Sequence, residues 1–244
     1  MNLTNRTIII TGGTSGIGLE LVNQLNVHNN KIIVVSKSAK KLQLFNERNN
    51  IYTFACNLAS KEETLKCIND IVKQHPDISV LINNAAVQFT PYFSDPEFNI
   101  DSIDEEIQVN LTAPILLSAV LIKHWKNNHI QSAIINISSA LALFPKTSSA
   151  VYCATKAALH NFSHALNYQL KNSVSQCHEV ILPLVDTPMT RGRENKKISA
   201  ISAAQQIIKG FQQQKFIIFV GKTKFLPLLA RISPALVANL LKGS

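Results

Sequence analysis

A tyrosine and a lysine four residues apart, Tyr152 and Lys156, are the side chains of this sequence best suited to move a proton. Residues at this spacing share one face of a helix, and a long helix is predicted from about residue 148 to Leu170. The ammonium of Lys156 is expected to lower the pKa of the phenol, so that Tyr152 can protonate a carbonyl oxygen or take the proton back. The pair alone is common by chance, and its structural alternative is an exposed pair on a helix.

Ser139 supplies a hydroxyl that could act on the same oxygen. It follows a β-branched run at residues 132–137, which predicts a buried strand, so it stands at the carboxyl end of that strand. Open α/β sheets bind their ligands at this edge. The hydroxyl could hold and polarise the oxygen that Tyr152 protonates, while a nicotinamide supplies the hydride.

A glycine-rich turn near the N-terminus is the predicted binding site for that nicotinamide cofactor. Residues 11–18 read Thr-Gly-Gly-Thr-Ser-Gly-Ile-Gly and lie between a predicted strand at 6–10 and a predicted helix at 19–25. Glycines let the main chain approach a phosphate closely, and the first helical turn offers free N–H groups. The spacing of Gly12, Gly16 and Gly18 differs from GxGxxG and lacks the Lys-Ser/Thr of a triphosphate loop. A tight turn that binds nothing is the alternative.

The end of the second predicted strand, residues 31–36, favours NADP(H) over NAD(H). A site for NAD usually carries an acid there for the ribose 2′-hydroxyl. Here the position is held by Ser36, followed by Lys37, and no acidic residue occurs between Leu21 and Asn46. A hydroxyl and an ammonium can bind a 2′-phosphate that a carboxylate would repel. The alternative is a solvated Lys37 and NAD(H).

The remaining segments alternate between strands and helices along the whole chain. Strands are predicted at 51–56, 78–82 and 216–220, and helices at 60–74, from about Asn99 or Asp101 to about Trp125, and at 198–211. This alternation predicts a parallel sheet with helices on both faces. Within the long helix, Asn110 lies on an apolar face and Pro114 can free its carbonyl, which predicts a local kink.

Composition places the chain among globular proteins. Of its 244 residues, 46% are hydrophobic and 16% charged, which fits one large α/β domain with a buried core. The net charge of +9 is scattered, so a basic enzyme that attracts a phosphorylated cofactor is favoured over a nucleic-acid binder. The four cysteines show no metal-binding spacing and are expected to be reduced thiols. No signal peptide and no long uninterrupted apolar stretch is recognised, so a cytoplasmic location without an integral membrane segment is expected.

These motifs, in this order and spacing, resemble those of the short-chain dehydrogenase/reductase family over nearly the whole chain. The matching features are residues 11–18, Asn83-Asn84-Ala85-Ala86, Asn110, Ser139 and Tyr152-x-x-x-Lys156. The resemblance implies a Rossmann-type, doubly wound parallel sheet of about seven strands in a single domain, residues 1–244. Residues 186–215 and 222–244 would form the substrate lid and a C-terminal cap.

The resemblance also implies roles for individual residues. Tyr152 would be the acid–base group and Ser139 the partner of the substrate oxygen, which it fits better by spacing than Ser138. Lys156 would bind the nicotinamide ribose as well as tune Tyr152, and Asn110 would support a water-mediated proton path. The expected cofactor-binding residues are Gly12, Thr14, Ser15, Gly16, Ile17, Gly18, Ser36, Lys37, Asn57, Leu58, Asn84, Ala85, Tyr152, Lys156 and Thr187. A metal site is not expected.

Two positions depart from the family pattern. Pro183-Leu184 stands where Pro-Gly is usual, although Thr187 still resembles the residue that contacts the carboxamide. Asn57 stands where an Asp is common, and its amide can make a similar contact to the adenine. A looser similarity, in residues 184–187 and 220–234, is to bacterial reductases encoded beside genes for the D-alanylation of teichoic acids. No D-alanine-related reaction follows from that similarity.

The leading hypothesis is therefore an NADP(H)-dependent oxidoreductase for a small carbonyl or alcohol, expected as a homodimer or homotetramer. The alternative is an NAD(P)-binding regulatory or interaction module without turnover. Arg191, Arg193, Lys196 and Lys197 in the lid could meet an acidic substrate, although a solvated loop is favoured. The apolar segment from Lys224 to Leu241 could close the pocket or form a subunit interface, with a peripheral membrane helix as a further alternative.

Overall fold

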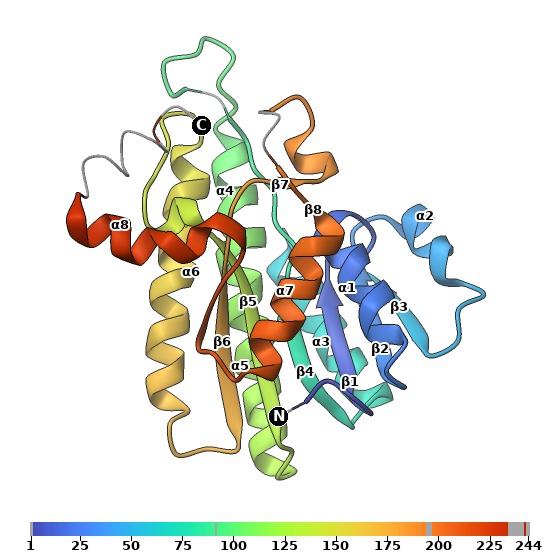
Figure 1. The fold of residues 1–244 in the computed structure, drawn as a ribbon. Helices are drawn as coiled ribbons and strands as arrows, with labels where there is room; N and C mark the ends of the chain where they lie inside the picture. Colours follow the sequence, from blue (N-terminus) through green and yellow to red (C-terminus); the bar gives the residue numbers. More distant parts are fainter. Residues whose placement is uncertain (1, 91, 194–196, 234–241, 243–244) are drawn as a thin grey trace.

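The fold is a parallel sheet covered by helices on both faces, in a computed structural model that describes residues 2–90, 92–193, 197–233 and 242 (Figure 1). Seven strands form the sheet in the order β3-β2-β1-β4-β5-β6-β9. The strand order reverses between β1 (Thr7–Thr11) and β4 (Ile78–Asn83). Ligands of such sheets bind at that reversal, beyond the carboxyl ends of the strands. The predicted doubly wound fold is confirmed.

The strands are built from continuous apolar runs because both faces of the sheet are covered. Ile8, Ile9 and Ile10 of β1 are fully buried, and so are the central residues of its neighbours. The other strands are β2 (Lys31–Ser36), β3 (Ile51–Ala55), β5 (Ser132–Ser139), β6 (Ser175–Leu182) and β9 (Ile217–Phe219). All pairings between these seven strands are parallel.

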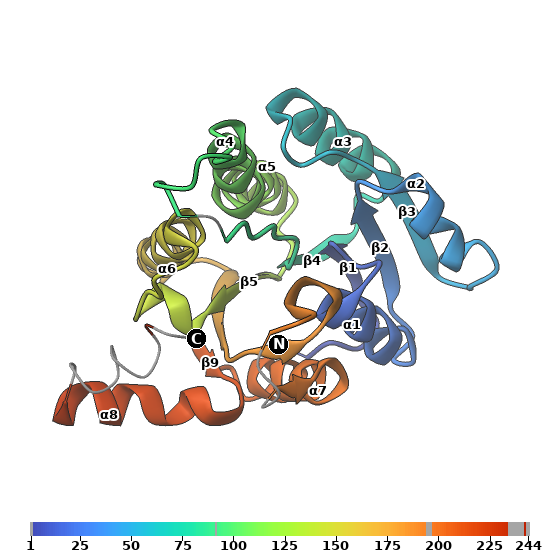
Figure 2. The ribbon, with the colours of Figure 1, turned by 90° about the horizontal axis from the view of Figure 1, so that it is seen from above.

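Two helical layers enclose two separate cores. Figure 2 shows α1 (Gly16–Asn26) and α7 (Ala200–Gln212) on one face, and α3 (Lys61–Gln74), α5 (Ala113–Asn127) and α6 (Ala150–Gln169) on the other. Leu21 and Phe211 belong to the first core, whereas Leu121 and Trp125 belong to the second. Short helices α2 (Ala39–Leu42) and α8 (Leu226–Ile232) lie at the periphery of this arrangement.

The predicted kink near Asn110 takes the form of a π-helical turn. Helix α4 (Asp101–Ile107) continues through the π turn Gln108–Thr112 into α5, with Pro114 in the first turn of α5. Single π turns often mark functional sites because they offset the main-chain hydrogen bonds. The run Asp101–Asn127 is long and apolar enough to cross a membrane. In this fold, however, its residues Leu121 and Trp125 are fully buried in the core.

The carboxyl-terminal third contains a second, two-stranded sheet, which the sequence patterns do not predict. It pairs β7 (Val185–Asp186) with β8 (Ile198–Ser199), so the predicted helix at 198–211 begins two residues later. Ser199 caps this helix by accepting a hydrogen bond from the Ser202 N–H. Lys196 of the predicted lid and residues 234–241, 243 and 244 of the predicted cap lie outside the described residues.

None of the four cysteines is in a disulfide in the described part of the chain, as expected. Cys56, Cys67, Cys153 and Cys177 are all buried free thiols.

Candidate active site

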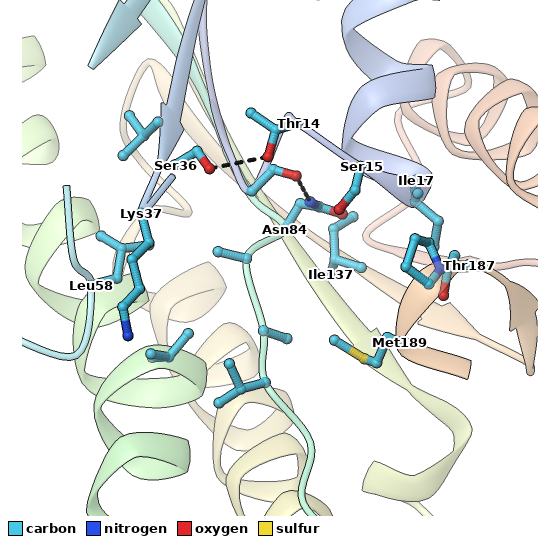
Figure 3. A pocket seen from close by; sticks show the side chains of 18 of the residues that line it. Thr14, Ser15, Ile17, Ser36, Lys37, Leu58, Asn84, Ile137, Thr187 and Met189 are labelled. Atoms are coloured by element: carbon cyan, nitrogen blue, oxygen red, sulfur yellow. Dashed lines mark hydrogen bonds between the residues drawn. The ribbon is translucent and has the colours of Figure 1, made fainter. Parts of the chain in front are cut away.

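One pocket at the carboxyl edge of the sheet brings the glycine turn and the Tyr152–Lys156 pair together. In Figure 3, Lys37 and Leu58 lie at one end of the pocket, whereas Thr187 and Met189 lie at the other. The pocket contains every predicted cofactor-binding residue except Gly18, which lies behind the turn. These lining residues are Gly12, Thr14, Ser15, Gly16, Ile17, Ser36, Lys37, Asn57, Leu58, Asn84, Ala85, Tyr152, Lys156 and Thr187.

The glycine turn is fixed to the end of β4 by main-chain and side-chain hydrogen bonds. The Thr11 hydroxyl accepts from the N–H groups of Asn84 and Ala85, both at 3.0 Å. The Asn84 amide donates to the carbonyls of Thr11 and Gly12, at 2.9 and 3.3 Å. Asn84 therefore holds the turn through its side chain, which is the structural role that paired asparagines often take.

Glycine is required in the turn because its neighbours leave no room for side chains. A Cβ at Gly18 would lie 2.3 Å from the carbonyl oxygen of Gly12. Gly12 itself has a φ of +67°, and a Cβ there would lie 2.9 Å from the Cα of Ala85. This tight packing keeps the main chain bare at the sheet edge, which fits the close approach of a dinucleotide phosphate.

The N-terminus of α1 is a second feature that fits a phosphate. Ser15 is the N-cap residue, and its side chain makes no capping hydrogen bond with the residues described. The first N–H groups of a helix have no partner within the helix, so a phosphate can take them, together with the Ser15 hydroxyl. A Cβ at Gly16 would lie 3.0 Å from Thr187, so this turn also borders the nicotinamide end predicted for Thr187.

The strand end that carries the predicted NADP(H) determinant also receives an acid from another element. The Ser36 hydroxyl lies 3.0 Å from that of Thr14, which joins β2 to the glycine turn (Figure 3). Lys37 forms an ion pair with Glu105 of α4, with 3.6 Å between Nζ and Oε1. The lysine side chain is 68% exposed, so this ion pair contributes little to stability. Glu105 also lines the pocket.

The predicted adenine end is formed by the turn after β3. Leu58 is buried, and the side-chain oxygen of Asn57 accepts from the Ala59 N–H at 3.3 Å. The N–H of Asn57 donates to Glu63 at 3.1 Å. The main-chain N–H and the side-chain oxygen of Asn57 thus form hydrogen bonds within the turn. Its side-chain amide nitrogen is the group that could donate to an adenine.

Tyr152 and Ser139 lie side by side at the catalytic end. The Tyr152 side chain is almost fully buried, and burial raises the pKa of its phenol above the usual range. Arg193 and a hydrogen bond from Ser139 act in the opposite direction on that pKa. The Ser139 hydroxyl also accepts from the Leu141 N–H at 3.1 Å, which orients it at the end of β5.

Lys156 is buried against the sheet rather than extended along the helix surface. Its Nζ donates to the carbonyl of Ile137 at 2.8 Å and lies 5.6 Å from the centre of the Tyr152 ring. Burial lowers the pKa of Lys156 to about 8, and the charge of Glu179 opposes that shift. The pKa of Tyr152 is thus raised in this geometry and not lowered as expected, because burial of the phenol outweighs the influences that lower it.

Asn110 holds the loop that follows β4. Its fully buried amide accepts from the Val87 N–H and donates to the Val87 carbonyl, both at 2.8 Å. It also donates to the Thr155 hydroxyl on α6 at 3.3 Å. The side chain thus connects the π turn, the loop after β4 and the helix of Tyr152.

A basic lid residue lies closer to the catalytic end than its sequence context suggests. Arg193 donates to the side-chain oxygen of Gln88 at 2.5 Å, and Gln88 donates to the Ser149 hydroxyl at 3.1 Å. Because Arg193 also lowers the pKa of Tyr152, its charge acts on the catalytic end. The favoured solvated loop is therefore wrong for Arg193, because no local pattern indicates a contact with Gln88, more than a hundred residues away.

Other pocket residues lie outside the sequence-based set. Some of them lie within the last three residues of strands β2, β5 and β6, where ligands of such sheets bind, and strand position therefore predicts them: Val35, Ile137, Ser138 and Leu182. Glu105, Pro188 and Met189 come from helices and loops whose positions no local pattern gives. Asn110 and Ser139 do not border this pocket but contact residues that do: Val87 for Asn110, and Tyr152 for Ser139.

Comparison with known proteins identifies the family of this chain. The family model described as short chain dehydrogenase matches residues 6–198. The chain is 33% identical over 222 residues to the uncharacterized oxidoreductase DltE of Bacillus subtilis, covering 88% of both proteins.

Two solved structures share the fold with cofactors bound. One is a short-chain dehydrogenase of Burkholderia cenocepacia in complex with NADP, with a TM-score of 0.87, 21% identity, and coverage of 99% of this chain and all of that one. The other is a short-chain dehydrogenase/reductase of Burkholderia phymatum in complex with NAD, with a TM-score of 0.84, 15% identity, and coverage of 100% and 97%.

Proposed function

The chain belongs to the short-chain dehydrogenase family, and on this premise we propose that it interconverts a carbonyl and a secondary alcohol with NADP(H), using Tyr152 as acid–base group. The observation that supports this proposal most strongly is that Tyr152 and Lys156 line the same pocket as the glycine turn. A proton donor and a dinucleotide cradle are thus side by side, as hydride and proton transfer to one carbonyl require.

The cofactor would lie between the two ends of the pocket. Ser15 and the first turn of α1 would hold its pyrophosphate, and Thr187 would contact the nicotinamide. When bound, a nicotinamide supplies the hydride, and the protein supplies position and charge. Lys156, which lines the pocket, would donate to the ribose in place of the Ile137 carbonyl that it now contacts.

The proton step is assigned to Tyr152. Because burial raises the pKa of the phenol, Tyr152 is protonated at neutral pH and can donate to a carbonyl oxygen. Ser139 would donate to the same oxygen and disperse its developing charge. Lys156, with a pKa of about 8, is largely an ammonium at neutral pH and would stabilise the phenolate that remains. We expect Asn110 to support the return of a proton to that lysine through water.

The preference for NADP(H) is proposed from Ser36 and Lys37 at the end of β2. The Lys37 ammonium is mostly exposed and could exchange Glu105 for a ribose 2′-phosphate, a stronger charged partner. Glu105 acts against this preference because a carboxylate near the same position repels a phosphate. Direct titration with NADPH and NADH decides which cofactor is preferred, and tighter binding of NADH would refute the NADP(H) assignment.

The substrate is proposed to be a small carbonyl or alcohol, with no nucleic-acid partner. We expect one domain, 1–244, in which residues 186–215 serve as a lid and 222–244 as a cap. A homodimer or homotetramer in the cytoplasm, without an integral membrane segment, remains the expected state. Arg193 at the catalytic end makes ketones with an acidic group the first class to test.

The test is NADPH oxidation against a panel of neutral and acidic carbonyl compounds. The wild type should consume NADPH with at least one of them, and Tyr152→Phe should lose about 10²–10⁴-fold in rate, the usual worth of a proton-transfer group. If Tyr152→Phe turns over as fast as the wild type on a good substrate, the mechanism is wrong. If the wild type binds NADPH but consumes none with any compound, a binding module without turnover is favoured.

A further inference from the structure

Two histidines and a carboxylate meet on the side of α6 that faces β6, outside the pocket. His160 and His164 are one helical turn apart on α6, and Glu179 reaches them from β6, which packs beside that helix (Figure 1). His160 Nδ1 lies 2.8 Å from Glu179 Oε2, and His164 Nε2 lies 4.0 Å from the same oxygen. One nitrogen from each histidine and one carboxylate oxygen all lie within 4.8 Å of one another.

The carboxylate in this cluster is incompletely satisfied. Glu179 is fully buried, and its Oε1 has no hydrogen-bond partner among the residues that the structure describes. Within the same described part of the chain, the buried Nε2 of His164 also has none. An unpaired buried charge is expensive, so each such atom in a native fold calls for a partner. A cation between the three side chains would be bound by His164 Nε2, and it would satisfy Oε1 if the carboxylate coordinates it through both oxygens.

We propose that His160, His164 and Glu179 form a binding site for a divalent transition-metal ion of the Zn²⁺ class. Two imidazoles and one carboxylate are a ligand set that such ions prefer. With bonds of about 2.1 Å, neighbouring ligand atoms of a tetrahedral site lie roughly 3.4 Å apart. The separations of 2.8 and 4.0 Å from the carboxylate oxygen lie on either side of this value, and all three ligand atoms lie within 4.8 Å of one another, so side-chain rotations would be needed to complete the site.

Neighbouring rings fix the orientation of His164 within the cluster. The rings of His160 and Phe216 pack against His164 at 4.5 and 4.8 Å and hold its orientation. Both histidine side chains are about one quarter exposed, at 26% and 28%, so the cluster lies near the surface although Glu179 and His164 Nε2 are buried.

The cluster offers nitrogen and oxygen ligand atoms alone. Cys177 lies two residues before Glu179 on β6 but is not among the described side chains whose ligand atoms meet there.

Zinc titration of tag-free, reduced protein tests the site. After treatment with a chelator and its removal, isothermal titration calorimetry with ZnCl₂ should give one equivalent per chain for the wild type. His164→Gln and Glu179→Gln should each weaken that binding at least tenfold. His28→Gln, which changes an exposed histidine of the turn after α1, is the matched control and should bind as the wild type does.

Two further measurements locate the ion and keep the test valid if Glu179→Gln unfolds. Anomalous scattering from a zinc-soaked crystal should place the ion within bonding distance of all three side chains. The Co²⁺-loaded protein should show weak visible bands without the near-ultraviolet band of a cobalt thiolate. Unchanged zinc affinity in a folded His164→Gln variant, a cobalt-thiolate band, or zinc that binds elsewhere in the crystal would each overturn the proposal.

Discussion

The polar groups that join the glycine turn to the end of β4 are hydrogen-bonded to one another, whereas several polar groups of β5, β6 and α6 are buried without a partner among the described residues. At the glycine turn, Thr11, Asn84 and Ala85 share a closed set of hydrogen bonds. At the other end, the Ser138 hydroxyl and one oxygen of Glu179 are buried, and neither has a partner in the described part of the chain. Lys156 is buried there with a single carbonyl as its partner.

This difference in hydrogen bonding corresponds to two functions, cofactor binding and proton transfer. A cofactor cradle must hold its shape before the ligand arrives, and the hydrogen bonds between the glycine turn and the end of β4 keep it rigid. A site that moves protons needs groups whose charge states lie close in energy, which burial without full pairing provides. Changes at the first end should therefore damage folding and cofactor binding together, whereas changes at the second should separate activity from stability.

The largest effect on stability is expected from Gly18→Ala. Its Cβ would lie 2.3 Å from the Gly12 carbonyl oxygen and 2.5 Å from the Asn84 amide nitrogen, so the turn must shift. Overpacking of this kind costs about 1–3 kcal/mol, and here it also displaces the phosphate site. Urea denaturation and NADPH titration should both show the loss. A variant with wild-type stability and affinity would show that the cradle does not depend on this packing.

Lys156→Met should show the opposite behaviour. Replacing a buried ammonium by an apolar side chain of similar length should raise the free energy of unfolding by about 1–3 kcal/mol at pH 7, while activity is lost. The folded lysine titrates near pH 8 and the unfolded one near 10.5. Between these values the unfolded chain holds more protons, so wild-type stability rises with pH and the advantage of the variant shrinks. Urea denaturation at pH 7 and pH 9.5 measures this.

A constant difference between Lys156→Met and the wild type across that range would contradict the assignment of a buried, perturbed lysine. The matched control is Lys31→Met, because Lys31 forms an exposed ion pair with Asp77. That control should change the free energy of unfolding by less than about 1 kcal/mol.

The smallest effect is expected from Glu105→Gln, which tests the NADP(H) end. Removing the carboxylate 3.6 Å from Lys37 frees the ammonium and removes a repulsive charge. NADPH affinity should rise by about two- to fivefold, in line with the modest energy of exposed charge pairs, while NADH affinity should change less. Fluorescence titration at low salt compares the two cofactors. Equal gains in affinity for NADPH and NADH would show that Glu105 does not act on the 2′-phosphate.

The sequence predicts the first end of the pocket more completely than the second. The strands around the glycine turn are continuous Ile and Val runs, and the turn residues are adjacent in the chain. The observed bounds of β2 are those predicted, residues 31–36. Local patterns suffice here because each element and its motif occupy the same short segment.

The second end depends on contacts between distant segments. Pro114 indicated a kink in the long helix, but only the structure gives it the form of a π turn that brings Asn110 to Val87. The same holds at the NADP(H) end for Glu105, which the sequence does not place near Lys37 because it comes from another helix. Outside the pocket, His160 and His164 have a visible helical spacing, yet Glu179, which completes their cluster, comes from a separate strand.

The most direct test of a pocket divided between binding and chemistry is to measure NADPH affinity and single-turnover reduction on the same sample of Tyr152→Phe. The dissociation constant should stay within about twofold of the wild type, while the rate of the single turnover falls by about 10²–10⁴-fold. A variant that loses affinity and rate in parallel, or that keeps its rate, would contradict the account.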